Sequence, residues 1–254
     1  MRKLVLIVVL LLMASACFAG VTYTVVTSTS QDGETYKMRV RTTVDGANAR
    51  IEILEGGPPP FNSGSWMLTQ DGGRTFIVVD PEHKTYSILT PKATLNDVDT
   101  RIEKQTKITN SVPEIKRVSQ EAGPELLGYV TSHAHFRTTY VVTFKLVDSF
   151  TAHVTKEDEV WAAPALKTLS AKDAPALSAG AQMGIDPLAG NLEFRQLGFP
   201  LKRITETRSE SVDGTVEKIV TNMEVTDLKE GPVEPKIFEL PANFKKIERQ
   251  SASD

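Results

Sequence analysis

The sequence of 254 residues contains a single cysteine, which excludes a disulfide-stabilised scaffold. It also lacks an excess of positive charge, because 29 Lys and Arg stand against 32 Asp and Glu for a formal net charge of −3. A weakly acidic chain has no bulk attraction to phosphate backbones, so we expect no nucleic-acid partner. With 40% hydrophobic and 24% charged residues, the composition is that of a globular protein and excludes collagen-like or wholly disordered chains.

The long apolar run of the chain lies at its N-terminus. Arg2 and Lys3 precede apolar residues 4–13, and small residues follow as far as Ala19. A basic start, a short apolar stretch and a small-residue cleavage zone predict a secretory signal peptide over residues 1–19. The run is too short to span a membrane, which takes about 20 apolar residues. We therefore expect an exported protein of the periplasm or cell envelope, with no transmembrane segment in its mature form.

Cys17 opens an alternative within this leader. Residues 14–17 (ASAC) loosely resemble a lipobox, where cleavage would make Cys17 a lipidated first residue. The leucine expected three positions before the cleavage point is absent, which favours ordinary cleavage after Ala19. That cleavage removes the only cysteine and, with Arg2 and Lys3, changes the net charge from −3 to −5.

The rest of the chain is rich in short alternating runs of β-branched and aromatic residues, separated by Gly, Asp, Asn and Pro. Such alternation is typical of half-buried antiparallel strands. The fold class predicted is mainly β (α+β). The predicted strands are residues 21–30, 35–44, 49–54, 65–69, 75–79, 84–90, 128–147, 151–163, 201–211 and 215–227.

The hairpin of residues 128–147 and 151–163 is the most informative part of this pattern. A three-residue loop at 148–150 places His153 opposite Lys145 and separates apolar from charged side chains. One face then carries Phe136, Tyr140, Val142, Phe144, Leu146, Ala152, Val154 and Val160. The other face carries Arg137, Lys145, Glu157, Glu159 and Trp161. A first strand of about 65 Å is longer than a domain usually permits, so we expect a bend or bulge near residues 138–139.

Two segments have helical rather than strand character. Apolar residues recur at helical spacing in residues 91–106, and residues 164–196 are Ala-rich, with prolines and aspartates that suit helix starts. We expect short helices here that cover one side of the sheet. Without an internal repeat or a low-complexity linker, residues 20–246 are predicted to form one domain, followed by a disordered tail at residues 247–254.

No constellation of reactive side chains stands out. His133 and His135 share a strand face about 7 Å apart, which suits a metal, but no third ligand is evident. Ser132 points away from His133, the wrong geometry for a nucleophile and its base. Glu157 and Glu159 share their face with cations and form a solvated charge ladder. We therefore predict no catalytic residue, no metal and no cofactor.

Several stretches resemble an exported bacterial family of unknown function that is similar to the LolA/LolB/LppX-like lipoprotein-carrier superfamily. Residues 66–89 read WMLTQDGGRTFIVVDPEHKTYSIL, residues 159–161 read EVW before the Ala-rich insert, and residues 199–202 read FPLK before the last hairpin. Residues 238–244, FELPANF, are similar to the closing motif of the family. The resemblance implies a strongly curved antiparallel half-barrel whose concave face is covered by short helices and, in such carriers, takes acyl chains.

These observations predict a non-enzymatic envelope protein that binds a lipid or other hydrophobic ligand on the concave face of its sheet. The predicted ligand-binding residues are Tyr36, Met38, Val40, Phe136, Tyr140, Val142 and Phe144. An envelope structural or interaction module without a small ligand, which contacts other envelope proteins, is the alternative. A hydrolase is a third candidate, which would need Glu157, Glu159 and one of the two histidines to converge in a cleft.

Overall fold

A computed structural model describes residues 20–57, 62–90, 108–145, 149–167, 169, 188 and 191–248. The predicted signal peptide with Cys17, the predicted helix at 91–106 and most of the Ala-rich insert lie outside these residues, as do the side chain of Phe144 and the end of the predicted tail. Three short helices are described: η2 (Pro164–Leu166), α5 (Leu192–Gln196) and η4 (Pro235–Phe238).

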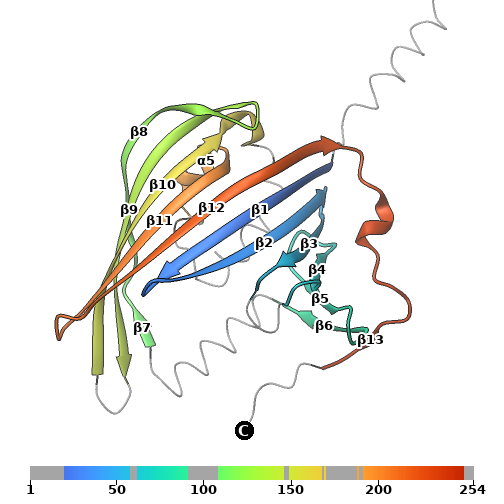
Figure 1. Ribbon diagram of the computed structural model, residues 1–254, viewed down its shortest axis with the longest axis horizontal. Helices are drawn as coiled ribbons and strands as arrows, with labels where there is room; N and C mark the ends of the chain where they lie inside the picture. The colour runs from blue at the N-terminus through green and yellow to red at the C-terminus, as the bar shows by residue number, and fades with distance from the viewer. Residues whose placement is uncertain are drawn as a thin grey trace, which may run out of the picture.

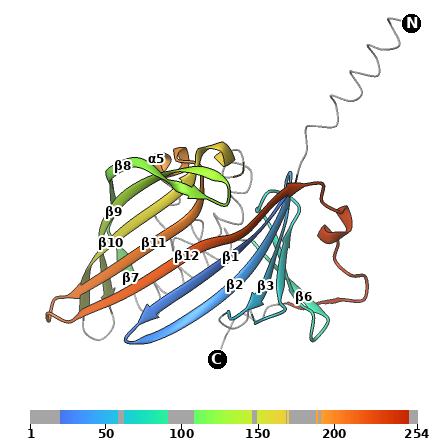
Figure 2. The same cartoon turned by 45° about the horizontal axis from the view of Figure 1, so that its top comes forward.

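The described strands form one sheet. They are β1 (Gly20–Gln31), β2 (Glu34–Asp45), β3 (Asn48–Glu55), β4 (Trp66–Thr69), β5 (Phe76–Asp80), β6 (Thr85–Leu89), β7 (Ile108–Asn110), β8 (Glu114–Leu126), β9 (Tyr129–Lys145), β10 (Ser149–Ala163), β11 (Phe199–Ser211), β12 (Val216–Gly231) and β13 (Lys245–Lys246). Their order is β13-β6-β5-β4-β3-β2-β1-β12-β11-β10-β9-β7, and β8 also pairs with β9. All pairs are antiparallel except β13 with β6. The sheet is strongly bowed and does not close, as Figures 1 and 2 show.

Tight turns set the register of the long strands. Asp32 and Gly33 join β1 to β2, with φ of 52° and 83°, and Gln31 pairs with Glu34. Two consecutive residues with positive φ are typical of a type I′ turn, whose twist matches that of the strands it joins. The predicted turn at this position is confirmed, and it fixes which residues of β1 and β2 share a face.

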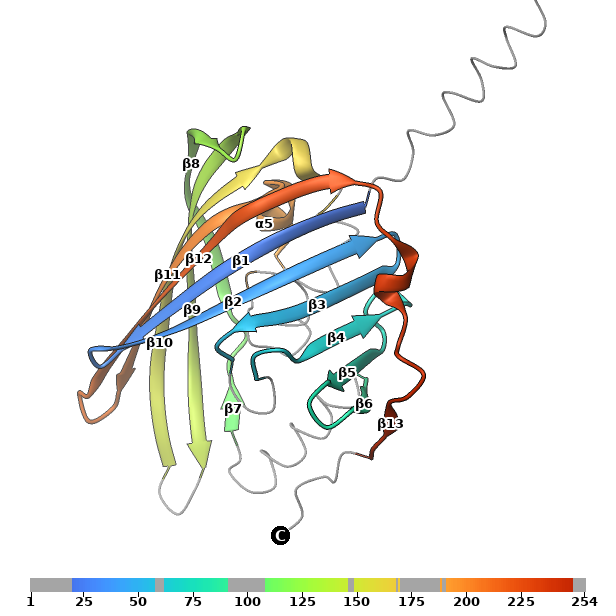
Figure 3. The same ribbon diagram turned by 45° about the vertical axis from the view of Figure 1, so that its right-hand side comes forward.

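One side of the sheet, which we call the inner face, carries two core clusters. Phe136 of β9 and Val160 of β10 are fully buried against Leu188 and Leu197. Phe194 of α5 lies edge-on to Phe136, with ring centroids 6.1 Å apart. The second cluster comprises Val21, Tyr23, Val44, Ala49, Ala163, Leu166, Phe199, Leu201 and Val225. Figure 3 shows α5 behind the long strands, on the concave side of the sheet.

The opposite side, the outer face, is covered at one end by the C-terminal segment. Trp66 and Leu68 of β4 are buried with Phe238 of η4. Arg50 of β3 donates a hydrogen bond of 3.1 Å to the carbonyl of Ile237, and its guanidinium lies 4.1 Å from the centre of the Trp66 ring. The motif at residues 238–244 therefore closes the outer side of β3–β6.

The structure corrects the predicted β9–β10 register by four residues. Lys145 pairs with Ser149, so His153 lies opposite Val141 rather than Lys145. Because the shift is an even number of residues, the same side chains still share a face. Pairing is unbroken from Ser132 to Lys145, so no bulge interrupts this ladder at residues 138–139, and β9 bends with the sheet instead.

Two further expectations need correction. Strand β8 was not predicted, because nearly all of its residues are exposed and it shows no apolar alternation; backbone pairing to β9 holds it. The predicted helical cover is supported only slightly: among the described helices, α5 and Leu166 of η2 pack on the inner face, whereas η4 packs on the outer face.

Candidate functional site

The residues predicted to bind a ligand lie on the inner face. The register places Tyr36, Met38 and Val40 of β2 on the same side of the sheet as Phe136, Tyr140 and Val142 of β9. Their burial differs. Phe136 is fully buried, Met38, Val40, Tyr140 and Val142 are half-buried, and Tyr36 is 63% exposed.

These residues do not form one continuous patch. Phe136 and Tyr36 stand at the two ends of a single cross-strand row, which runs Phe136, Asp158, Thr205, Thr221, Thr29 and Tyr36. Met38 and Val40 lie on one side of this row, and Tyr140 and Val142 lie on the other. Five strand spacings separate β9 from β2, about 24 Å along the sheet. Only the curvature of the sheet turns the two groups towards each other.

The middle of this row is polar, a feature that the alternation along single strands does not predict. Asp158 accepts a hydrogen bond of 2.5 Å from Thr205 Oγ1, and the hydroxyls of Thr221 and Thr29 lie 3.2 Å apart. We call Asp158, Thr205, Thr221 and Thr29 the polar row. The inner face is therefore divided by a band of carboxylate and hydroxyl groups, instead of being uniformly apolar.

Asp158 and Arg203 form a buried ion pair beside this row. The Asp158 side chain is fully buried, and that of Arg203 is 13% exposed. Arg203 Nη2 and Nε lie 2.8 and 2.9 Å from Asp158 Oδ1. The Arg203 guanidinium also lies 5.6 Å from the centre of the Phe194 ring on α5. The pair compensates a charge that burial alone would make costly.

A local signal for this site exists in the sequence. Residues 156–159 read KEDE, four consecutive charged residues within a strand. Since successive side chains of a strand point to opposite faces, such a run must place two charges on each face. Lys156 and Asp158 therefore point to the inner face, while Glu157 and Glu159 point outward. The predicted charge ladder accounted for Glu157 and Glu159 on the outer face, but not for Lys156 and Asp158 on the inner face.

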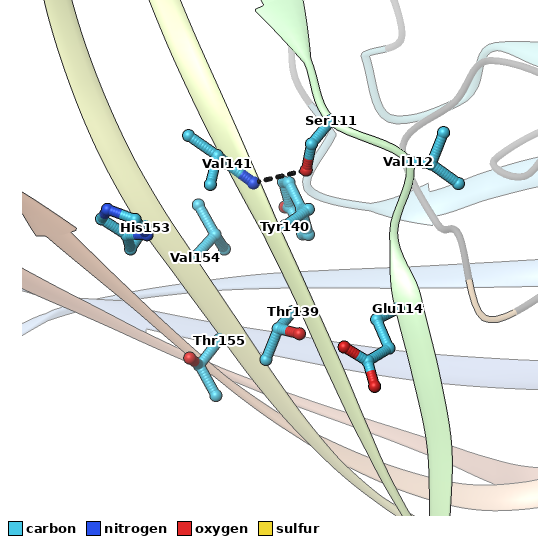
Figure 4. Close-up of a pocket in the computed structure, with 9 residues that line it drawn as sticks. All are labelled: Ser111, Val112, Glu114, Thr139, Tyr140, Val141, His153, Val154 and Thr155. Carbon is cyan, nitrogen blue, oxygen red and sulfur yellow. Dashed lines mark hydrogen bonds between the residues drawn. The ribbon is translucent and has the colours of Figure 1, made fainter.

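A pocket of about 360 Å³ lies at the edge of the sheet, where β7 ends and β8 begins along β9. Its lining residues are Ser111, Val112, Glu114, Thr139, Tyr140, Val141, His153, Val154 and Thr155 (Figure 4). The Val141 amide donates a hydrogen bond of 2.9 Å to Ser111 Oγ, which holds the linking segment to β9. Burial raises the pKa of the Tyr140 phenol. Of the predicted ligand-binding residues, Tyr140 thus lines this pocket.

A cluster of histidines and glutamates lies on the outer face. His133 Nε2 contacts Glu159, and its Nδ1 lies 3.2 Å from Glu121 Oε1. His135 Nε2 lies 2.7 Å from Glu157 Oε2.

Glu157, Glu159 and the two histidines, which the hydrolase candidate requires, therefore do lie close together. They form ion pairs, however, in which the side chains are 21–71% exposed. His133 also stacks on Trp161, with ring centroids 4.5 Å apart. Within the described ranges, no group of three or more His, Cys, Asp or Glu residues is arranged to hold a metal ion.

Taken together, the fold and site define a bowed, unclosed antiparallel sheet with a partly apolar inner face. In the part of the chain that the structure describes, no helix is long and apolar enough to cross a membrane. No protein-family model and no curated protein matches the sequence.

Solved structures with a similar arrangement include PNGF-II, a DUF1329 family protein from Desulfovibrio piger and a putative outer membrane lipoprotein-sorting protein domain from Vibrio parahaemolyticus. For PNGF-II the TM-score is 0.37 at 14% identity, over 91% of this chain and 31% of that chain, so this chain spans about a third of its length. For the DUF1329 protein the TM-score is 0.34 at 10% identity, over 91% of this chain and 93% of that chain. For the sorting domain the TM-score is 0.31 at 8% identity, over 87% of this chain and 89% of that chain.

The resemblance seen in the sequence is confirmed to this extent: a protein family of unknown function and a lipoprotein-sorting domain are among the structures similar to this chain. At these TM-scores the similarities carry no argument about what the protein binds.

Proposed function

We propose that this protein is exported to the periplasm or cell envelope and binds a lipid or other hydrophobic ligand on the inner face of its sheet. Residues 20–246 act as one binding domain, without catalysis and without a cofactor. The ligand-binding residues are Tyr36, Met38, Val40, Phe136, Tyr140, Val142 and Phe144. The signal peptide predicted from residues 1–19 supports the location, with ordinary cleavage favoured over lipidation of Cys17.

One observation carries the proposal. The inner face is fully packed around Phe136 and Tyr23, yet Met38, Val40, Tyr140 and Val142 on the same face are only half-buried. A bowed sheet turns such side chains towards each other, and covering their remaining apolar area with a ligand is favourable by about 25 cal/mol per Å². The pocket beside Tyr140 lies within the 300–1,000 Å³ range of small-molecule sites.

The proposal is tested by titrating the purified protein with 1-N-phenylnaphthylamine, an apolar dye whose fluorescence rises in apolar surroundings. We expect saturable binding to the wild type. Met38→Glu and Val142→Glu place a charge on the inner face and should weaken binding at least tenfold, because the carboxylate must be desolvated when the dye binds. Arg39→Glu changes the neighbouring residue on the outer face and should leave binding unchanged.

Failure of the wild type to bind the dye, or equal effects of Met38→Glu and Arg39→Glu, would exclude the inner face as the site. Organic extraction of protein purified from its native cells, followed by mass spectrometry, then identifies the natural ligand.

A second candidate is an envelope interaction module without a small ligand. The packing of Leu188 and Leu197 on Phe136, and of Leu166 on the cluster around Tyr23, favours it, since these residues fill part of the inner face themselves. Under this alternative, extraction yields no amphiphile and the dye does not bind.

A further inference from the structure

Among the described residues, two polar atoms on the inner face are buried without a hydrogen-bond partner. They are Oδ2 of Asp158 and Oγ1 of Thr138, in side chains whose residues are 0% and 1% exposed. All the contacts described above for the Asp158 carboxylate converge on its other oxygen, Oδ1. A buried polar atom left unpaired costs about 1–3 kcal/mol, so each of these atoms requires an explanation.

The two atoms belong to neighbouring positions of one ladder. Asp158 pairs with Phe136, and Thr138 pairs with Lys156, so Asp158 and Thr138 are diagonal neighbours about 7 Å apart. Both side chains point to the inner face, at the edge of the polar row. Together they offer one oxygen that only accepts hydrogen bonds and one hydroxyl that can also donate.

The surroundings of these atoms are apolar on one side and positively charged on the other. Phe136 and Val160 are fully buried beside Asp158, and the Phe194 ring lies against Phe136. Arg203 balances the Asp158 charge, and Lys156 lies one row away on the same face of β10. A cationic head group would meet two cations here, and an anionic one would meet the Asp158 carboxylate.

We propose that this pair of atoms binds the hydroxyl of an uncharged amphiphile. The ligand hydroxyl donates to Asp158 Oδ2 and accepts a hydrogen bond from Thr138 Oγ1, and its alkyl chain lies against the half-buried apolar residues of the inner face. This inference rests on the proposed function, and it names the class of ligand: a neutral lipid that carries a free hydroxyl group, such as a monoacylglycerol or a fatty alcohol.

The test compares probes with the same acyl chain. Monolauroylglycerol carries free hydroxyls, methyl laurate carries none, and sodium laurate is anionic. Each is used to displace 1-N-phenylnaphthylamine from the full-length protein. We expect monolauroylglycerol to displace the dye at a concentration about tenfold lower than methyl laurate or laurate, the ratio expected for one or two well-made hydrogen bonds.

Two variants locate the effect. Thr138→Val is nearly isosteric and removes Oγ1, and Asp158→Asn replaces the accepting Oδ2 by an amide. Each should reduce the preference for monolauroylglycerol to about threefold or less. Thr143→Val is the matched control, since it changes another threonine of β9, which points to the outer face and is not among the lining residues of the pocket of Figure 4. It should leave the preference unchanged. Circular dichroism verifies that each variant is folded.

The outcomes separate the two proposals. If the dye does not bind the wild type, the proposed function fails. If the dye binds and all three probes displace it equally, the hydroxyl site is wrong and the apolar site stands, with water as the partner of Asp158 Oδ2. A further variant, Thr139→Val, changes the lining of the pocket of Figure 4. If it removes the preference and Thr138→Val does not, the hydroxyl binds in that pocket at the sheet edge and the inference is overturned. If Asp158→Asn does not fold, the effect of Thr138→Val on the preference for monolauroylglycerol decides whether the hydroxyl site exists.

Discussion

Replacing Arg203 by methionine tests whether the Asp158–Arg203 pair is buried in solution. The substitution keeps much of the side-chain volume and removes both guanidinium contacts to Asp158 Oδ1, at 2.8 and 2.9 Å. It leaves a fully buried carboxylate with Thr205 as its hydrogen-bond donor among the contacts described above. Loss of one partner of a buried pair costs about 3–5 kcal/mol, so we expect that decrease in the free energy of unfolding.

In a chain of this size, each 1 kcal/mol changes Tm by about 2–4 °C, so Arg203→Met should lower Tm by about 6–20 °C. Urea unfolding followed by circular dichroism gives the free energy directly. The double variant Asp158→Leu, Arg203→Met removes both charges and should recover most of the loss, since apolar side chains can replace a buried pair at little cost.

Arg208→Met is the control. Arg208 pairs with Glu210 at 3.3 Å, but both side chains are more than half exposed, so the loss should be about 0.5 kcal/mol or less. If Arg203→Met costs no more than Arg208→Met, water reaches Asp158 and the buried polar row does not exist as described.

The other predictions concern packing, backbone strain and titration. Thr138→Val should raise the free energy of unfolding by about 1 kcal/mol, because it removes a buried oxygen without a partner; a loss on urea unfolding would show that Oγ1 is paired. Gly198→Ala should cost more than about 2 kcal/mol, since its φ is +113° and a Cβ would lie 2.2 Å from the Ala163 carbonyl oxygen, whereas Gly214→Ala, in open space, should cost about 1 kcal/mol. The hydrogen bond from His83 lowers the pKa of Asp80, and Asp80 raises the pKa of His83 above 6.5. The His83 contribution to stability is therefore complete below pH 6.5 and lost as pH rises through the raised pKa, and that of Asp80 is lost as pH falls through its lowered pKa. NMR titration should give a His83 midpoint above 6.5 that returns towards 6.5 in Asp80→Asn; an unchanged midpoint would contradict the contact.

Local pattern was sufficient for the strands that bury one face. The alternation in residues 35–44 and 128–147 predicted β2 and β9, because a strand with one face on a core must repeat every two residues. The same period separated Phe136 and Val142 from Arg137 and Glu157 correctly, even though the predicted register was four residues in error. Strand β8 could not be predicted from such alternation, because it buries neither face and so shows no repeat of apolar residues.

Alternation along single strands assigned side chains to faces, but it says nothing about which residues of distant strands lie in line. Asp158 of β10 meets Thr205 of β11, and Thr221 of β12 meets Thr29 of β1, only because pairing brings together residues up to 192 positions apart. The buried pair of Asp158 with Arg203, and the division of the inner face by a polar row, therefore arise from tertiary register. The sequence determined which side chains turn inward. The order and stagger of the strands decided which of these side chains lie next to each other, because the hydrogen bonds between strands join residues that are far apart in the sequence.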